Sequence, residues 1–218
     1  MLLNRIETAM MNNPLRAALQ RHFEAPRLRA MGGALPGARV LEVGCGRGVG
    51  TGLILDLFQA EHVDAFDLDP AMVALARKRL APRGARVRLW TGDAARIEAL
   101  DGAYDAVFDF GIIHHVPAWR DAVREVHRVL RPGGRFYAEE VLARFIGHPV
   151  WRRVLEHPQH DRFDHDAFRA ALDAQGFRVV ASRELFGQFA WFVADKPDPD
   201  APPVTAGSPS RTSKPTPL

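Results

Sequence analysis

The stretch Val40–Gly50 constrains the fold of this chain more than any other, because an apolar run ends there in three alternating glycines. The residues before the first glycine are typical of a buried strand, and those after the third continue in a helical pattern. Glycine tolerates positive φ and has no side chain, so Gly44, Gly46 and Gly48 let a ligand lie against the backbone. The stretch predicts a strand over residues 39–43, a tight turn and a helix, with a ligand at the carboxyl end of the strand.

The spacing of the glycines separates two classes of ligand. A dinucleotide-binding turn needs the pattern Gly-x-Gly-x-x-Gly. If the pattern starts at Gly44, its third glycine would have to be at Val49, and if it starts at Gly46, at Thr51. This spacing disfavours an NAD-dependent oxidoreductase. The pattern acid-x-Gly-x-Gly-x-Gly fits instead, and it resembles the first motif of class I S-adenosylmethionine (SAM)-dependent methyltransferases. The resemblance implies that the methionine end of SAM is held by Glu42, Gly44, Cys45, Gly46 and Gly48.

An acidic residue follows the next predicted strand, which we place at residues 62–66. Asp67 lies 23 residues after Gly44, where a carboxylate can accept hydrogen bonds from both hydroxyls of a ribose. An NAD-binding fold has an acid there too, so Asp67 alone does not discriminate between the two cofactors. Leu68 is grouped with Asp67 in the cofactor site. Asp69, directly before a proline, is expected to cap the next helix.

A Gly-Asp-Ala triplet ends the third predicted strand, residues 86–90. In the resembled family such an aspartate, here Asp93, accepts a hydrogen bond from the exocyclic amine of adenine, and the next backbone N–H, here that of Ala94, donates to a ring nitrogen. The pairing is chemically sound because a carboxylate only accepts and an amino group donates. The alternative is a turn aspartate that caps a helix over residues 94–100, and one residue can do both.

The block from residue 104 to residue 134 resembles the fourth-to-sixth motifs of small-molecule methyltransferases, with a strand at 104–110 and Arg-Pro-Gly-Gly before a fifth strand at 135–140. The resemblance adds Asp109 and Phe110 to the cofactor contacts. It implies an α/β fold: a Rossmann-like, doubly wound seven-stranded sheet, mostly parallel with a reversed final strand, and helices on both faces. Because ligands bind at the carboxyl ends of parallel strands, these motifs are expected to share one cleft.

The remaining elements follow from periodicity. We predict helices at residues 50–58 and 71–80, a helix that begins near Asp164 and ends before Gly176, and a closing hairpin with strands at 177–182 and 190–194. Residues 1–31 predict two amphipathic helices, the second starting near Pro14. Their apolar side chains, including Leu15, Leu19, Phe23 and Leu28, are expected to pack against the sheet. In the resembled family such helices also close over the substrate.

We expect three segments along the chain. Residues 1–37 form the N-terminal helices and a substrate lid, and residues 38–195 form the SAM-binding domain with a variable substrate-covering insert at about 141–163. Residues 196–218 are rich in proline and poor in bulky apolar side chains, so they cannot bury enough surface to offset the cost of ordering. This last segment is expected to be a disordered tail.

Methyl transfer from a sulfonium is an in-line displacement with a good leaving group, so alignment and exclusion of water are the main demands on the protein. A base is needed only when the acceptor loses a proton, and histidine suits that role. His115 is the first candidate and His114 the second; alternatively, either one caps its loop. Candidate substrate contacts are Glu139 and Glu140, which end the fifth strand, and Trp151 in the insert.

The spacing of His157, His160 and His165 with Asp161 suggests a metal site, but Pro158 interrupts the spacing and no motif supports it, so we expect none.

The 29 basic and 26 acidic residues give a net charge of +3 without any basic run, which gives no support for nucleic-acid binding. A single cysteine excludes an intrachain disulfide and is typical of a reducing compartment. With charges at the N-terminus and no long apolar run, we expect a cytoplasmic protein without a membrane span.

The expected function is SAM-dependent methyl transfer to a small-molecule acceptor, through oxygen, nitrogen, sulfur or carbon, which leaves S-adenosylhomocysteine (SAH). The alternative is a non-catalytic SAM-binding module of the same fold that acts on a protein partner. The two hypotheses share the cofactor residues and differ in whether a methyl group is transferred.

Overall fold

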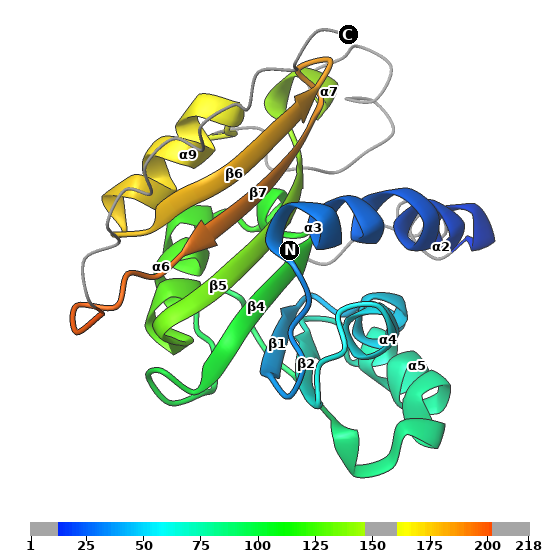
Figure 1. Ribbon diagram of the computed structural model, residues 1–218. Coiled ribbons are helices and arrows are strands. Elements are labelled where there is room, and N and C mark those ends of the chain that lie inside the picture. Colours follow the sequence, from blue (N-terminus) through cyan, green and yellow to red (C-terminus); the bar gives the residue numbers. More distant parts are fainter. Residues whose placement is uncertain (1–12, 147–160, 202–218) are drawn as a thin grey trace, which may run out of the picture.

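The computed structural model describes residues 13–146 and 161–201. Its strands are β1 (Arg39–Val43), β2 (His62–Asp67), β3 (Val87–Thr91), β4 (Tyr104–Phe110), β5 (Leu130–Val141), β6 (Arg178–Leu185) and β7 (Phe189–Asp195). They form one sheet in the order β3-β2-β1-β4-β5-β7-β6 (Figure 1). Strands β1 to β5 run parallel, whereas β7 is antiparallel to both β5 and β6. The predicted seven-stranded sheet with a reversed final strand is confirmed.

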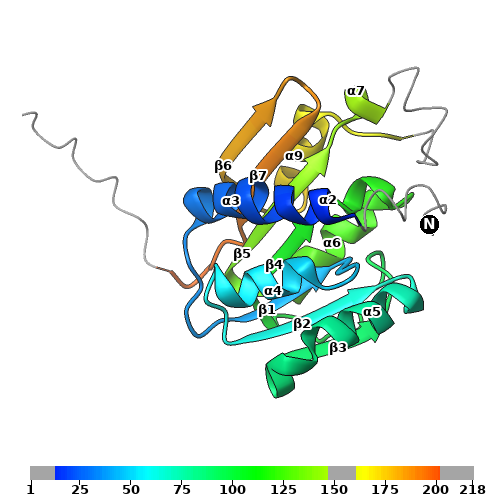
Figure 2. The same ribbon diagram turned by 90° about the vertical axis from the view of Figure 1, so that its right-hand side faces the viewer.

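Helices cover both faces of the sheet (Figure 2). They are α2 (Pro14–Leu19), η1 (Gln20–Glu24), α3 (Ala25–Gly32), α4 (Val49–Asp56), α5 (Pro70–Leu80), η2 (Ala81–Arg86), η3 (Ile113–His115), α6 (Trp119–Val129), α7 (Ala143–Ile146) and α9 (His165–Ala174). One core lies between the sheet and α3, α4 and α5, and includes Leu28 and Ile54. The other lies beneath α6 and α9 and includes Val126 and Phe168. Burial on both faces explains why the parallel strands read as nearly continuous apolar runs.

Most element boundaries follow the sequence pattern, and those of β1 and β4 are the predicted ones. Strand β5 begins at Leu130, earlier than the predicted residue 135, because Leu130 already pairs with Tyr104. The register then shifts, so that Arg135 pairs with Ala106. The Arg-Pro-Gly-Gly segment therefore forms an irregularity within the strand and does not precede it.

The alternative helix over residues 94–100 does not form. Side chains of α6 form hydrogen bonds with backbone groups that would otherwise bond to one another within such a helix. The N–H of Ile97 donates to Glu125 Oε2 at 2.9 Å, and Arg128 donates to the carbonyl oxygens of Ile97 and Ala99, both at 2.8 Å. These contacts hold the segment as a loop against the sheet, and they could not be read from the local sequence.

The N-terminal described helices form one continuous rod that crosses the sheet (Figure 2). Its start at Pro14 is as predicted, and the side chain of Asn13 accepts from the N–H of Arg16 at 2.8 Å. The expected packing of its apolar residues is only partly correct, because Leu28 is buried whereas Leu15 and Leu19 are exposed. The first predicted helix, most of the insert including Trp151, and most of the C-terminal tail lie outside the described residues.

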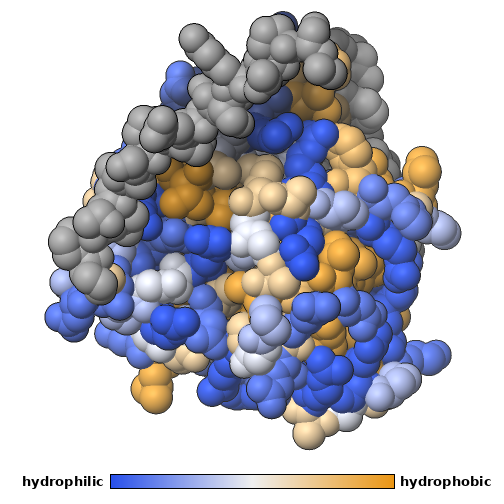
Figure 3. Space-filling model, viewed as in Figure 1, coloured by the Kyte–Doolittle hydropathy of each residue, from blue (hydrophilic) through white to orange (hydrophobic). Residues whose placement is uncertain are grey.

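The surface of the described part is mixed. On the face shown in Figure 3, hydrophilic residues surround separate apolar areas. Within residues 13–146 and 161–201, none of the helices has both the length and the apolar character that a membrane crossing requires.

The backbone at the end of helix α3 packs closely against side chains of β5. The Tyr137 hydroxyl donates to the carbonyl oxygen of Gly32 at 2.8 Å, and Arg135 Nη1 donates to the same oxygen at 2.6 Å. A Cβ at Gly32 would overlap the fully buried ring of Tyr137. A glycine at this position therefore sets how closely the rod approaches the sheet.

Two helical glycines give a matched test of this close packing. Gly32→Ala should lower the free energy of unfolding by about 1–3 kcal/mol, because the new methyl group overpacks against Tyr137. Gly52→Ala in α4 meets no atom within 4 Å and should raise it by up to about 1 kcal/mol through helix propensity. Urea unfolding measures both changes. Equal stabilities of the two variants would contradict the close packing of α3 against Tyr137.

Candidate active site

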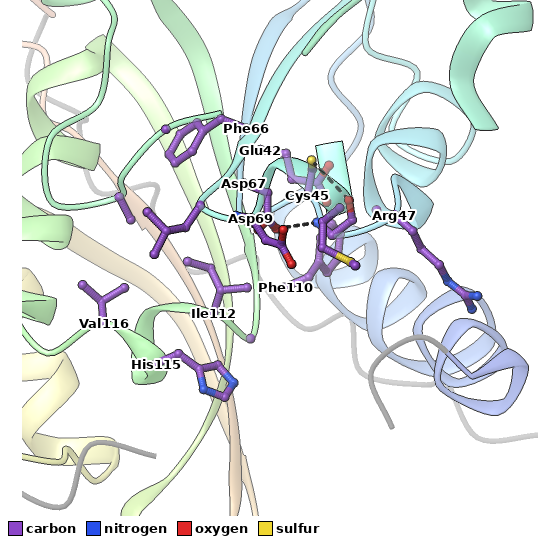
Figure 4. Close-up of a pocket in the computed structure, with 18 of the residues that line it drawn as sticks. Glu42, Cys45, Arg47, Phe66, Asp67, Asp69, Phe110, Ile112, His115 and Val116 are labelled. Carbon is purple, nitrogen blue, oxygen red and sulfur yellow. Dashed lines mark hydrogen bonds between the residues drawn. The ribbon is translucent and has the colours of Figure 1, made fainter. Parts of the chain in front are cut away.

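A cavity of about 420 Å³ opens at the carboxyl ends of β1, β2, β3 and β4 (Figure 4). Its walls come from the loops that follow these strands and from the rod formed by α2 and η1. The predicted site residues that line it are Glu42, Gly44, Cys45, Gly46, Asp67, Leu68, Asp93, Ala94, Phe110 and His115. Four sequence motifs that are far apart in the chain therefore meet at one cavity.

Other predicted residues lie beside the cavity and not in its wall. They are Gly48, Asp109, His114, Glu139 and Glu140. Trp151 lies outside the described residues, as do His157 and His160 of the discarded metal pattern. Within the described ranges, no group of three His, Cys, Asp or Glu side chains is placed to hold a metal ion.

The glycine turn has the left-handed backbone that its sequence predicted, with φ of +70° at Gly44, +49° at Gly46 and +81° at Gly48. A Cβ at Gly44 would come within 2.6 Å of the Ile112 side chain, so this glycine lets the loop after β4 close over the turn. A Cβ at Gly48 would instead meet Leu80 of α5 at 2.7 Å. Gly44 and Gly46 thus shape the cavity, whereas Gly48 serves the packing behind it.

Asp67 connects the loops after β1 and β2. Its Oδ2 accepts from the N–H of Gly46 at 2.8 Å, and its Oδ1 accepts from the N–H of Asp69 at 2.9 Å. Burial raises the pKa of Asp67, while these backbone hydrogen bonds act in the opposite direction. Each carboxylate oxygen keeps a second lone pair for a ligand. Asp69 caps α5, as predicted, by accepting from the N–H of Ala71 at 2.8 Å.

Glu42 lies at the closed end of the cavity and is fully buried. The Thr51 hydroxyl donates to its Oε2, and the lack of a side chain at Gly50 leaves room for its other oxygen. Burial raises the pKa of Glu42 to about 8, which exceeds the effect of the Thr51 hydrogen bond, and the charge of Asp67 raises it further. The carboxyl group is therefore largely protonated at neutral pH and would ionise beside a bound cation.

The opposite end of the cavity lies after β3. Asp93 is exposed there, and its Oδ1 accepts from the N–H of Ala95 at 2.9 Å. Phe66 forms part of the wall beside it and packs on Trp90, with ring centroids 5.3 Å apart. This end offers a carboxylate next to a flat apolar surface, which suits a planar group that has hydrogen-bond donors on its edge.

The side chains of the two adjacent histidines of η3 point in different directions. His115 lines the cavity, on the loop that also carries Ile112 and Val116 (Figure 4). His114 is buried behind it, with its Nδ1 2.6 Å from Glu140 Oε2. The two imidazole rings lie 4.1 Å apart between centroids. Only His115 of this pair can therefore face a molecule in the cavity, and His114 supports it from behind.

A pair of buried carboxyl groups holds this loop. Asp109 Oδ1 accepts from the N–H of Ile112 at 2.8 Å, and the carboxyl groups of Asp109 and Glu140 influence each other's pKa. Burial and the charge of Glu140 raise the pKa of Asp109 well above its ordinary range, and burial raises the pKa of Glu140 to about 7. One proton shared by the pair, carried by Asp109, explains how two adjacent acids are accommodated. Their observed contacts are with the loop and with His114.

Sequence reasoning expected the N-terminal helices to cover the substrate, but it missed which of their side chains line the cavity. Arg16, Ala17 and Gln20 line the cavity, and so does Arg47, which extends toward α2 and donates to the carbonyl oxygen of Asn13 at 2.9 Å (Figure 4). The apolar periodicity of residues 15–28 had indicated the opposite face of the helix. The usable signal was the spacing of the polar residues at 16, 20 and 24, which also lie on one helical face.

Comparison with known proteins gives a consistent result. The family whose profile matches is described as a methyltransferase domain, over residues 40–134. The demethylmenaquinone methyltransferase of Thermus thermophilus is 35% identical over 198 residues, covering 78% of this chain and 89% of that protein. The fatty-acid O-methyltransferase of Mycolicibacterium smegmatis is 34% identical over 119 residues, covering 55% of this chain but only 42% of that protein.

This chain thus spans less than half the length of some curated relatives that it matches. Among solved structures, the [4+2]-cyclase SpnF superimposes with a TM-score of 0.67 at 20% identity, covering 80% of each chain. A likeness at that identity shows the shared fold and leaves the reaction to be argued from the site.

The high pKa of Glu42 makes stability depend on pH. Between its ordinary pKa of 4.5 and its folded value of about 8, the folded protein keeps a proton that the unfolded chain releases. The free energy of unfolding of the ligand-free protein should therefore fall as the pH rises through this window. Glu42→Gln should make the fall less steep, whereas the exposed control Glu98→Gln should not. Urea unfolding from pH 5 to 8 measures this, and an unchanged slope in Glu42→Gln would contradict the assignment.

Proposed function

We propose, since this chain belongs to the family of SAM-dependent methyltransferases, that it transfers the methyl group of SAM to a small-molecule acceptor by in-line displacement. The observation that carries the proposal is the meeting of the glycine turn, Asp67 and Asp93 at one cavity. These residues follow three neighbouring parallel strands, where an open α/β sheet binds its ligands.

The residues present fit SAM along the whole length of the cavity. Glu42 is a buried acid that a bound cation would ionise, which suits the ammonium of the methionine end beside the glycine turn. Asp67 keeps acceptor positions for the ribose hydroxyls. Asp93 and the N–H of Ala94 suit the amine and a ring nitrogen of adenine, with Leu68 and Phe110 as apolar cavity walls. We assign Cys45 to this site by its place in the turn.

When bound, SAM supplies a methyl group activated by a sulfonium. The protein then has to align the acceptor and exclude water from it. Ile112, Val116 and Pro117 offer an apolar wall for this purpose, next to His115. We propose that His115 accepts a proton when the acceptor must lose one, and that His114 and Glu140 hold its ring in place.

The relatives named above act on different molecules, a demethylated menaquinone and fatty acids. We propose a small-molecule acceptor for this chain also, with residues 1–37 as its lid and residues 38–195 as its catalytic domain. A protein whose single cysteine is reduced suits the cytoplasm, where we propose that it works. The alternative function is a SAM-binding module without catalysis.

The experiment that separates these functions combines binding with transfer. Calorimetry should show that the chain binds SAM and SAH, and methyl-labelled SAM should pass its label to a compound in a small-molecule cell extract. Binding without any labelled product would favour the module. Binding of NADH without binding of SAM would contradict both readings.

The same assay tests the proposed base. His115→Ala should lower turnover by roughly 10²- to 10⁴-fold where the acceptor loses a proton in the step. Its affinity for SAM should stay nearly unchanged, because the proposed SAM contacts are made by other residues. His22→Ala, on the exposed side of η1, is the matched control and should keep full turnover. Full turnover in His115→Ala would remove it from the mechanism.

A further inference from the structure

The first half of the helical rod, residues 14–24, has the reverse of the usual polarity. Arg16, Gln20 and Glu24 lie four residues apart and face inward, and the last two are only 8% and 4% exposed. On the neighbouring stripe, Leu15 and Leu19 are 79% and 47% exposed. A helix held only by core packing would bury its apolar stripe. The inward polar stripe therefore calls for a reason other than packing.

The stripe is anchored to the sheet by a compact ionic cluster, defined here as Arg16, Glu24 and Glu139. Arg16 Nη1 binds Glu24 Oε2, and Arg16 Nη2 lies 3.9 Å from Glu139 Oε1. Burial, followed by the charge of Glu24, raises the pKa of Glu139 well above its ordinary range. Protonation of Glu139 lowers the negative charge gathered around the Arg16 guanidinium.

A buried cluster of this kind contributes little net stability, because desolvation of the charges offsets their attraction. What it does provide is a defined position for the guanidinium. The local π-helical turn η1, from Gln20 to Glu24, is a second irregularity at the same place, and such turns often occur at functional sites. Both features point to orientation of Arg16.

The cluster lies on the acceptor side of the cavity. The cofactor residues follow β1, β2 and β3, whereas Glu139 is near the carboxyl end of β5, on the far side of β4. His115 lines the cavity on the loop after β4, the strand that lies between β1 and β5 in the sheet. Arg16 is thus held at the side of the cavity where a molecule other than the cofactor would enter the reaction.

Only the cationic member of the cluster faces the cavity. Arg16 lines it and its side chain is 20% exposed, whereas Glu24 and Glu139 do not line it and are each 5% exposed. Gln20 lines the cavity one helical turn further along. A guanidinium has five N–H donors in a planar fork that matches a carboxylate, so Arg16 can bind Glu24 and still donate to a ligand. A cationic ligand would gain nothing at this wall.

We propose that Arg16, with Gln20 beside it, binds a carboxylate group of the methyl acceptor, and that the acceptor's apolar body lies against Ile112 and Val116. The proposal rests on the proposed function, since it names the class of acceptor used at that same site. Glu24 and Glu139 are positioning residues that hold the guanidinium toward the cavity. The acceptor class is a small organic acid with an apolar body.

The test uses the full chain loaded with SAH and three probes with one apolar tail: octanoate, octan-1-ol and octylamine. Calorimetry should show that octanoate binds most tightly. Arg16→Gln should weaken octanoate binding by roughly 10- to 100-fold, the loss of a charged hydrogen bond. Arg16→Lys keeps the charge without the fork and should fall between. Arg124→Gln, in an exposed pair on α6, is the control and should bind octanoate as the wild type does.

The affinity for SAH separates this proposal from a cofactor role of Arg16. It should be the same in Arg16→Gln and in the wild type; a parallel loss of SAH and octanoate binding would overturn the proposal. Equal binding of octanoate and octan-1-ol, tighter binding of octylamine, or no binding of octanoate would also overturn it. Failure of the wild type to bind SAH would contradict the proposed function instead, and octanoate titrated without SAH would then test the carboxylate site by itself.

Discussion

The hydrogen bond from the N–H of Gly46 to Asp67 is the contact on which the rest of the site depends. It joins the loops after two neighbouring parallel strands at 2.8 Å and holds the glycine turn in its left-handed conformation. That turn leaves the space into which Ile112 packs against Gly44, and the Ile112 loop in turn carries His115. The Asp67 carboxylate, the proposed ribose contact, is thus linked to the loop where we propose that methyl transfer takes place.

Buried carboxyl groups recur around this cavity, and each has a different partner. Glu42 accepts from the Thr51 hydroxyl, Asp109 accepts from the N–H of Ile112, Glu140 lies against His114, and Glu139 lies near Arg16. Acids with raised pKa values are costly inside a protein and tend to gather where ligands bind. Their common location beside one cavity is a physical argument for function that does not depend on any likeness to other proteins.

The sequence could predict what depends on local pattern. The glycine turn, the limits of β1 and β4, the Asp69 cap and the reversed hairpin follow from periodicity and from the motifs. The binding roles of Asp67 and Asp93 stay predictions. Segments whose partners are distant in sequence were missed. The loop at 94–100 depends on Arg128, and the inward turn of Arg16 depends on Glu139, more than 100 residues away. Such pairings are tertiary choices that override helix periodicity and propensity.

If four separate loops form one binding site for SAM and its product, all four should respond together to SAH. Hydrogen–deuterium exchange during a titration with SAH measures this response. Residues 44–50, 67–72, 92–95 and 110–118 should all gain protection, with the same half-saturating concentration. Protection of the glycine turn alone, or of the four segments at clearly different concentrations, would contradict a single site.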